Sequence, residues 1–157
     1  MKTIGVLVLV TLVLSLTACS YSTDFVIVNN STEVLKVEYR VKETPYEFAP
    51  PVTPAVLPAS QLGSHETGDW TKLDRLQYVL DPDQRTVTIV LFPGQALLVN
   101  RMRDYAGHGD AAKAKDFPLD QITLDGASGV LSLSGDEART KFSPSFKQVF
   151  VLAYPAN

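Results

Sequence analysis

Residues 33–42 read Glu-Val-Leu-Lys-Val-Glu-Tyr-Arg-Val-Lys, and apolar and charged side chains alternate along most of this stretch. A repeat of two residues places one set of side chains on each face of a β-strand. The apolar set is Leu35, Val37, Tyr39 and Val41, and the charged set is Lys36, Glu38, Arg40 and Lys42. One face of this strand is therefore expected to pack on a core while the other meets water, as in antiparallel sheets.

Seven further segments carry the β-branched, aromatic or alternating apolar residues that are typical of strands. They are residues 24–29, 75–80, 86–91, 96–102, 121–124, 130–133 and 148–154. The Asn-Asn-Ser-Thr turn signal at 29–32 predicts that the first of them forms a hairpin with residues 33–42. Alternation in the second predicts that its core side carries Leu76, Tyr78 and Leu80. The last is apolar on both faces and should lie inside a sheet.

Turn signals separate these segments, and together they predict the architecture. Asp81–Gln84 suits a type I turn, Phe92–Gln95 a type II turn, and residues 125–129 a glycine-containing hairpin loop. About eight short strands at this spacing are typical of a β-sandwich or barrel. We expect an all-β chain that forms a single antiparallel β-sandwich, with an immunoglobulin-like arrangement preferred. A capping-box pattern at 134–137 and the segment 110–115 predict one or two short helical turns.

Two segments interrupt the strand pattern. Residues 44–60 hold five prolines, at positions 45, 50, 51, 54 and 58. Proline cannot donate a backbone hydrogen bond to a sheet and favours an extended conformation. This proline-rich loop, continued through residues 61–69, is expected to be either a stiff strap between the two sheets or a functional loop. Residues 104–116, with Gly107-His108-Gly109 at their centre, form the second irregular segment.

The first 19 residues have the layout of a secretory signal peptide rather than of a fold element. Lys2 precedes an apolar run at residues 4–16, and the chain's only cysteine follows shortly after it. As a helix the run would span only about 20 Å, less than the roughly 30 Å hydrocarbon core of a bilayer. The sequence Leu16-Thr17-Ala18-Cys19 resembles the lipobox of bacterial lipoproteins.

This resemblance implies that Cys19 is lipidated, because in that family the Cys sulfur carries diacylglycerol and the chain is cut just before it. We therefore expect residues 1–18 to be a cleaved signal peptide, 19–23 a lipidated N-terminus with a short tether, and 24–157 the β-sandwich domain. Ser20 follows the cysteine where an Asp would imply retention at the inner membrane, so in a Gram-negative host the resemblance implies the periplasmic face of the outer membrane. Acyl chains would hold the protein to the bilayer, with a tether of at most about 14 Å.

Composition limits the partners and the chemistry. The chain has 14 basic and 17 acidic residues and a net charge of −3, which argues against a nucleic-acid partner. With its single cysteine modified, the folded part has no thiol for a disulfide. His65 and Glu66 begin like the H-E-x-x-H motif of zinc proteases, but Asp69 stands where the second His is needed. We expect no cofactor, no metal site and no catalytic residue.

Aromatic side chains beside the irregular segments are the candidate binding residues, since aromatic residues on loops are typical anchors of recognition surfaces. The candidates are Tyr46, Phe48, Trp70, Tyr105 and His108. The alternative for the aromatic residues is that each caps the core, and Trp70 in particular suits a core position.

Three classes of function are open at this point. The favoured one is a non-catalytic binding or accessory module close to the membrane, with an envelope protein or a cell-wall component as partner. The second is a structural subunit of an envelope assembly, for which an exposed unpaired edge strand would be the sign. The third is a metal-binding protein or hydrolase, which would need His65 and His108 to converge with carboxylates.

Overall fold

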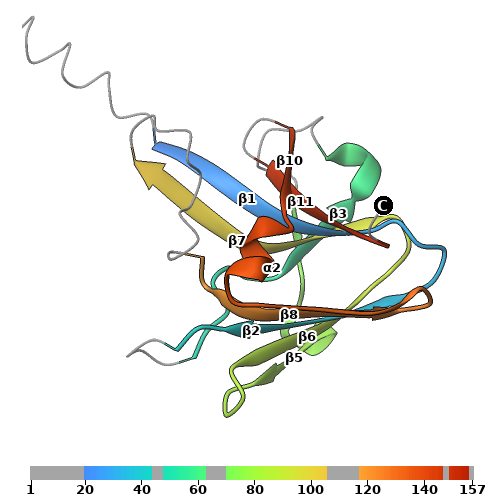
Figure 1. The fold of residues 1–157 in the computed structure, drawn as a ribbon, viewed down its shortest axis with the longest axis horizontal. Helices are drawn as coiled ribbons and strands as arrows, with labels where there is room; N and C mark the ends of the chain where they lie inside the picture. The colour runs from blue at the N-terminus through green and yellow to red at the C-terminus, as the bar shows by residue number, and fades with distance from the viewer. Residues whose placement is uncertain (1–19, 44–47, 63–69, 106–116, 147–148, 156–157) are drawn as a thin grey trace, which may run out of the picture.

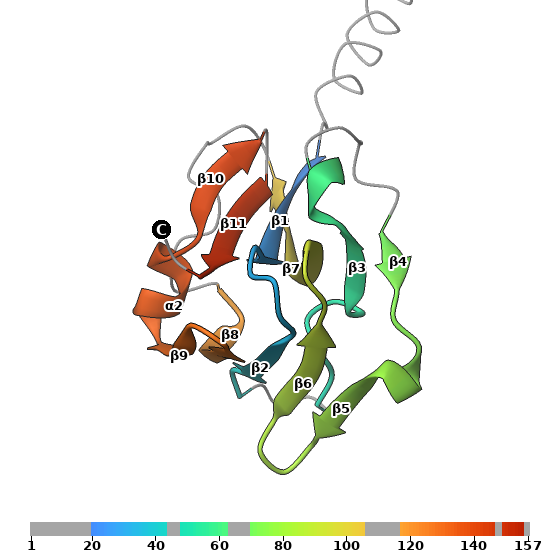
Figure 2. The same cartoon turned by 90° about the vertical axis from the view of Figure 1, so that its right-hand side faces the viewer.

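A computed structural model describes residues 20–43, 48–62, 70–105, 117–146 and 149–155. These residues form a sheet of six strands and a sheet of five, here called sheet A and sheet B, which pack face to face (Figure 1). Figure 2 shows the two sheets one above the other, with β10 and β9 at one side and β4 and β5 at the other. The all-β class and the two-sheet, sandwich-like arrangement expected from the sequence are confirmed.

Sheet A has the strand order β10-β11-β1-β7-β3-β4. The bounds of its strands are β10 (Ser143–Phe146), β11 (Val149–Tyr154), β1 (Ser20–Asn29), β7 (Gln95–Tyr105), β3 (Ala55–Pro58) and β4 (Thr71–Lys72). Sheet B has the order β5-β6-β2-β8-β9. Its strands are β5 (Tyr78–Asp81), β6 (Thr86–Leu91), β2 (Leu35–Val41), β8 (Leu119–Gly126) and β9 (Gly129–Ser134). Short helical turns are η1 (Ala59–Gln61), η2 (Arg75–Gln77) and α2 (Asp136–Thr140).

The alternation in residues 33–42 has the structural meaning predicted for it. All four apolar side chains of β2 are buried in the core between the sheets, whereas Lys36 and Arg40 are exposed on the outer face of sheet B. Strand β1 contributes Phe25 and Ile27 to the same core from sheet A. Burial of such side chains away from water is the main favourable term that holds the two sheets together.

Strand β1 corrects two expectations, the hairpin with residues 33–42 and the purely antiparallel pairing. It lies in sheet A, between β11 and β7, whereas β2 lies in sheet B. Its pairing with β11 is parallel, with Asp24 opposite Val149 and Asn29 opposite Tyr154. The physical reason is that both faces of β1 are apolar. Val26 and Val28 are buried on the face away from Phe25 and Ile27, so the strand needs a place inside a sheet covered on both sides.

Three strands of the eleven (six plus five) were not expected, namely β3, β4 and β10. Each is short, and β3 and β10 contain proline. A further difference concerns Leu76, which is 98 % exposed rather than core-facing. Residues 75–77 form the turn η2 instead of a strand, held by a hydrogen bond from the Asp74 N–H to the Gln77 side chain (2.7 Å).

The described part of the proline-rich loop, residues 48–62, includes β3 of sheet A, and several of its side chains cover the outer face of sheet A. A second apolar cluster lies on that face, built from β1, β3 and β7. Val52, Leu57, Leu62 and Trp70 pack against it. Half-buried Trp70 therefore covers this outer cluster and does not plug the core between the sheets.

The buried side chain of Asn29 ties together the two corners at which the chain passes between the sheets. Its Nδ2 donates to the carbonyl of Glu33 (2.8 Å), in the β1–β2 corner, and to the carbonyl of Leu91 (3.0 Å), where β6 ends. Its Oδ1 accepts from the Ser31 N–H (3.0 Å) and hydroxyl (2.7 Å). Its backbone oxygen accepts from the N–H of Gly94 (2.9 Å), in the β6–β7 turn.

Asn29→Ala is expected to lower the free energy of unfolding by roughly 2–4 kcal/mol, because it removes all the side-chain bonds of Asn29 and takes the Asn29 donor from the buried Leu91 carbonyl. The matched control is Asn30→Ala, since Asn30 is exposed and adjacent, and it should change stability by no more than about 0.5 kcal/mol. Urea unfolding followed by circular dichroism measures both. Equal stability of the two variants would contradict this role for Asn29.

Candidate functional site

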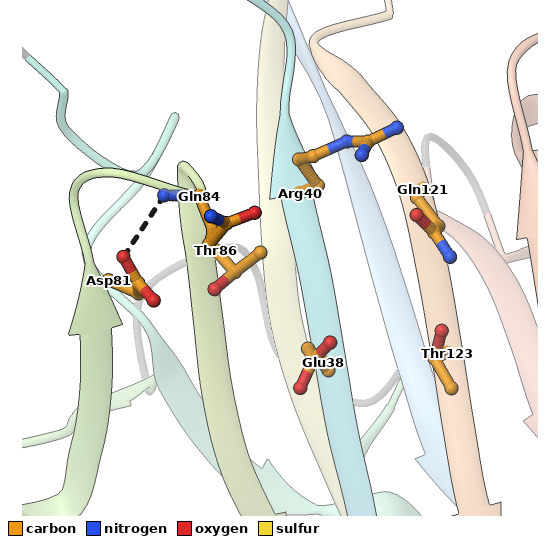
Figure 3. A pocket seen from close by; sticks show the side chains of 7 residues that line it. All are labelled: Glu38, Arg40, Asp81, Gln84, Thr86, Gln121 and Thr123. Carbon is orange, nitrogen blue, oxygen red and sulfur yellow. Dashed lines mark hydrogen bonds between the residues drawn. The ribbon is translucent and has the colours of Figure 1, made fainter.

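A polar pocket of about 310 Å³ opens on the outer face of sheet B. Figure 3 shows its lining side chains, which come from β2, β6, β8 and the end and following turn of β5. They are Glu38, Arg40, Asp81, Gln84, Thr86, Gln121 and Thr123. Every lining residue is polar, so the pocket can form hydrogen bonds around a ligand but offers it little apolar surface.

Strand register brings these residues together. Arg40 on β2 lies between Thr86 on β6 and Gln121 on β8, which are its direct cross-strand neighbours. One step along the same face, Glu38 lies opposite Thr123. The strands place these side chains outward because their neighbours in sequence, Tyr39, Val87 and Ile122, are buried in the core.

Most of the formal charge in the pocket is compensated by neighbouring side chains. The Nε and Nη2 atoms of Arg40 donate to one oxygen of Asp120 at 2.9 and 2.6 Å. The carboxylate of Glu38 accepts from the Thr88 hydroxyl at 3.3 Å and lies 3.6 Å from the Lys36 ammonium. Asp81 accepts from the backbone N–H of Gln84 at 3.0 Å, the dashed line of Figure 3.

The uncompensated polar groups of the pocket are therefore mainly neutral. They are the amides of Gln84 and Gln121 and the hydroxyls of Thr86 and Thr123. The only side-chain bonds of these four within the described part of the chain are long contacts to Ser132, at 3.4 Å from Gln121 and 3.5 Å from Thr123. Amide and hydroxyl groups both donate and accept, which suits a ligand that carries hydroxyl or amide groups of its own.

The structure places only part of the predicted site residues. Cys19, Tyr46 and His108 lie outside the described residues, as does His65. Tyr105 is the last residue of β7 and pairs with Ser20, and its side chain lies outside the described part.

Phe48 and Trp70 are both half-buried but are not brought together. Phe48 packs against the core between the sheets, with the guanidinium of Arg85 5.6 Å from its ring centre. Trp70 packs on the outer cluster of sheet A.

The sequence interpretation missed the pocket residues because each is an ordinary polar side chain on the wet face of its strand. The sequence signal that could have indicated the pocket was the presence of polar residues at outward-facing positions of several neighbouring strands.

Asp24 and Arg101 form an ion pair close to the start of β1. Two hydrogen bonds join the guanidinium to the carboxylate at 2.6 and 2.8 Å, and only 2 % of the Asp24 side chain is exposed. The bond to Asp24 raises the pKa of Arg101, against the opposite effect of partial burial. Arg101 is thus half-buried and engaged with its cross-strand neighbour.

Tyr39 is a second buried polar group. Its phenol is 1 % exposed, and its hydroxyl has no hydrogen-bond partner among the residues that the structure describes. Desolvation, with a smaller contribution from nearby Tyr78, raises the pKa of the Tyr39 phenol far above its usual value.

Stability at alkaline pH should depend on Tyr39. The unfolded phenol ionises near pH 10, whereas the folded one keeps its proton, so stability is fully present below about pH 10 and falls above it. Above pH 10, the Tyr39 phenol alone would lower the free energy of unfolding by about 1.4 kcal/mol per pH unit. At pH 7 the Tyr39→Phe variant should be about as stable as the wild type. Between pH 10 and 11 its free energy of unfolding, measured by urea titration, should fall less than that of the wild type. If the free energy of unfolding of Tyr39→Phe fell as steeply with pH as that of the wild type, this role of Tyr39 would be contradicted.

Two other kinds of feature are absent from the described ranges. They hold no group of three or more His, Cys, Asp and Glu side chains that could bind a metal ion. Among the same residues no helix is long and apolar enough to span a bilayer.

Comparison of the chain with protein-family models, with curated proteins and with solved structures finds no match.

Proposed function

We propose that this protein is a lipid-anchored envelope protein whose domain acts as a non-catalytic binding module close to the membrane. The observation that carries the binding role is the polar pocket on sheet B, with its seven hydrogen-bonding side chains from four strands and a turn. The anchor rests on the lipobox-like Leu16-Thr17-Ala18-Cys19.

The chemistry of the pocket favours a cell-wall saccharide or its attached peptide as the ligand. Such molecules present hydroxyl and amide groups, which match the amides and hydroxyls of Gln84, Thr86, Gln121 and Thr123. Because Asp120 neutralises Arg40 and Lys36 offsets Glu38, the pocket has no strong preference for an anion.

The position of the pocket suits a ligand near the membrane. The described chain starts at Ser20, runs along β1 to the corner at Asn29, and returns along β2 to Val41. The end of β2, where Arg40 pairs with Thr86 and Gln121, therefore lies toward the same end of the two-sheet structure as the start of β1 (Figure 1). A short lipidated tether would hold this end close to the bilayer.

We also propose that the two sheets have an immunoglobulin-like topology. Two features support it: the chain passes repeatedly from one sheet to the other, and the last strand, β11, runs parallel to the first, β1.

The anchor is tested with Cys19→Ala in the full-length chain, expressed in a Gram-negative host. We expect the wild type in the membrane fraction, released by detergent but not by high salt, and the variant in the soluble part of the envelope. Ser20→Asp is the matched control, because it keeps the cysteine and should stay membrane-bound. Membrane retention of Cys19→Ala would rule out a lipid anchor at this residue.

The pocket is tested with purified, solubilised cell-wall fragments and the full-length protein in detergent. Gln84→Ala combined with Gln121→Ala should weaken binding about 30-fold, since two hydrogen bonds of about 1 kcal/mol each are lost. Asp125→Asn is the control, because Asp125 is exposed on β8 outside the pocket. Calorimetry measures the affinities. Absence of binding by the wild type, or equal weakening by the control, would reject the proposed ligand.

A further inference from the structure

Strand β9 is the one edge strand of the two described sheets that is neither short nor interrupted by proline or charge. The other three edges are each blunted: β10 contains Pro144, β4 has two residues including Lys72, and β5 has four residues ending in Asp81 before Pro82. Short length, proline and charge are the usual protections of an edge. β9 has six residues, Gly-Val-Leu-Ser-Leu-Ser, with neither proline nor charge.

The backbone of β9 offers a regular row of hydrogen-bonding groups on its outer side. Bonded and non-bonded pairs alternate along an antiparallel ladder. The Gly135 N–H donates to the Asp120 carbonyl at 2.8 Å, so Gly135 and Asp120 are one of the bonded pairs of the β8–β9 ladder. By alternation Leu133 and Leu131 bond to β8, as Gly129 does. The N–H and C=O groups of Val130, Ser132 and Ser134 therefore point away from the sheet.

The side chains of this edge are also accessible. Val130 is 66 % exposed, and Ser132 and Ser134 are exposed on the outer face. On the inner face Leu133 is buried, but Leu131, nearer the loop, is only half-buried. β9 lies at the margin of its sheet in Figure 2, below α2.

We propose that β9 pairs with β9 of a second copy of this chain, antiparallel and about a two-fold axis at Ser132. In this register Ser132 faces its own copy and Val130 faces the second copy's Ser134. All three outward residues of each chain are used, which gives about six backbone hydrogen bonds. Leu131 then lies beside the second copy's Leu133, which covers its half-exposed side chain.

A second copy fits this edge better than a charged partner because β9 is neutral and self-complementary. In a two-fold contact the residue on the axis meets its own copy, so a charge at that position would repel itself. The only side chains of β9 are Val, Leu and Ser, which are uncharged and do not repel a second copy of themselves. The result is a continuous ten-stranded sheet that presents both polar pockets on one face. The pairing uses the edge and not the pocket, so it stands independently of the proposed ligand.

Disulfide trapping tests the contact in membranes that contain the full-length chain. Ser132→Cys should give a crosslinked dimer under mild oxidation, since directly opposite Cα atoms lie about 5.5 Å apart, within disulfide reach. Val79→Cys is the matched control, because Val79 is 64 % exposed on β5 at the opposite edge of the same sheet. The wild type reports any background from Cys19. Equal crosslinking of the control, no crosslinking at 132, or an adduct with a different protein would overturn the proposal.

A charge exchange at the same position gives a second, independent readout. Ser132→Lys and Ser132→Glu should each sediment as a monomer in density-matched detergent, and an equimolar mixture should recover the dimer mass of the wild type. Both should keep the wild-type circular dichroism spectrum, because Ser132 is exposed. A monomeric wild type, or a Lys variant that stays dimeric, would show that β9 does not form the contact.

Discussion

The hydrogen bonds of Asn29 are the constraint on which the two-sheet arrangement depends. A sandwich needs corners where the chain leaves one sheet for the other, and backbone groups at such corners lose their ladder partners. One buried amide serves the β1–β2 corner through Glu33 and the end of β6 through Leu91. Since the neighbouring Asn30 N–H donates to the Tyr154 carbonyl at 2.7 Å, the end of β11 is tied to the same place. Four strands from both sheets thus share one polar node.

The sequence predicted the strands better than it predicted their partners. Residues 33–42 could be assigned because one face is apolar and the other charged, and this pattern survives in β2 as buried and exposed positions. The Asn-Asn-Ser-Thr signal at 29–32 correctly indicated a reversal of the chain. A turn signal, however, does not say whether the next strand joins the same sheet or the opposite one. β3 and β10 were missed because their strand conformation depends on an available edge of β7 or β11 rather than on local propensity.

The candidate site was hidden for a related reason. Arg40, Thr86 and Gln121 are far apart in the chain, and each has the polar character expected on a wet face. Only strand register, which long-range packing sets, makes them neighbours. The aromatic residues attracted attention for their chemical type, yet Phe48 and Trp70 serve two separate apolar clusters on opposite faces of sheet A. Residue type indicates what a side chain can do, whereas topology decides with which others it acts.

The central place of β1 has a mechanical consequence. β1 follows the proposed lipid tether and is bonded along its length, to β7 from Ser20 and to β11 from Asp24. Tension applied at Ser20 would act along the strand axis, so both ladders would be loaded in shear and their hydrogen bonds would share the force. A strand at a sheet edge pulled sideways would lose its bonds one at a time. The Asp24–Arg101 pair adds a cross-strand link four residues from the point of loading. A domain held by its first strand in this way can bear a pull between the proposed anchor and the proposed ligand without unzipping.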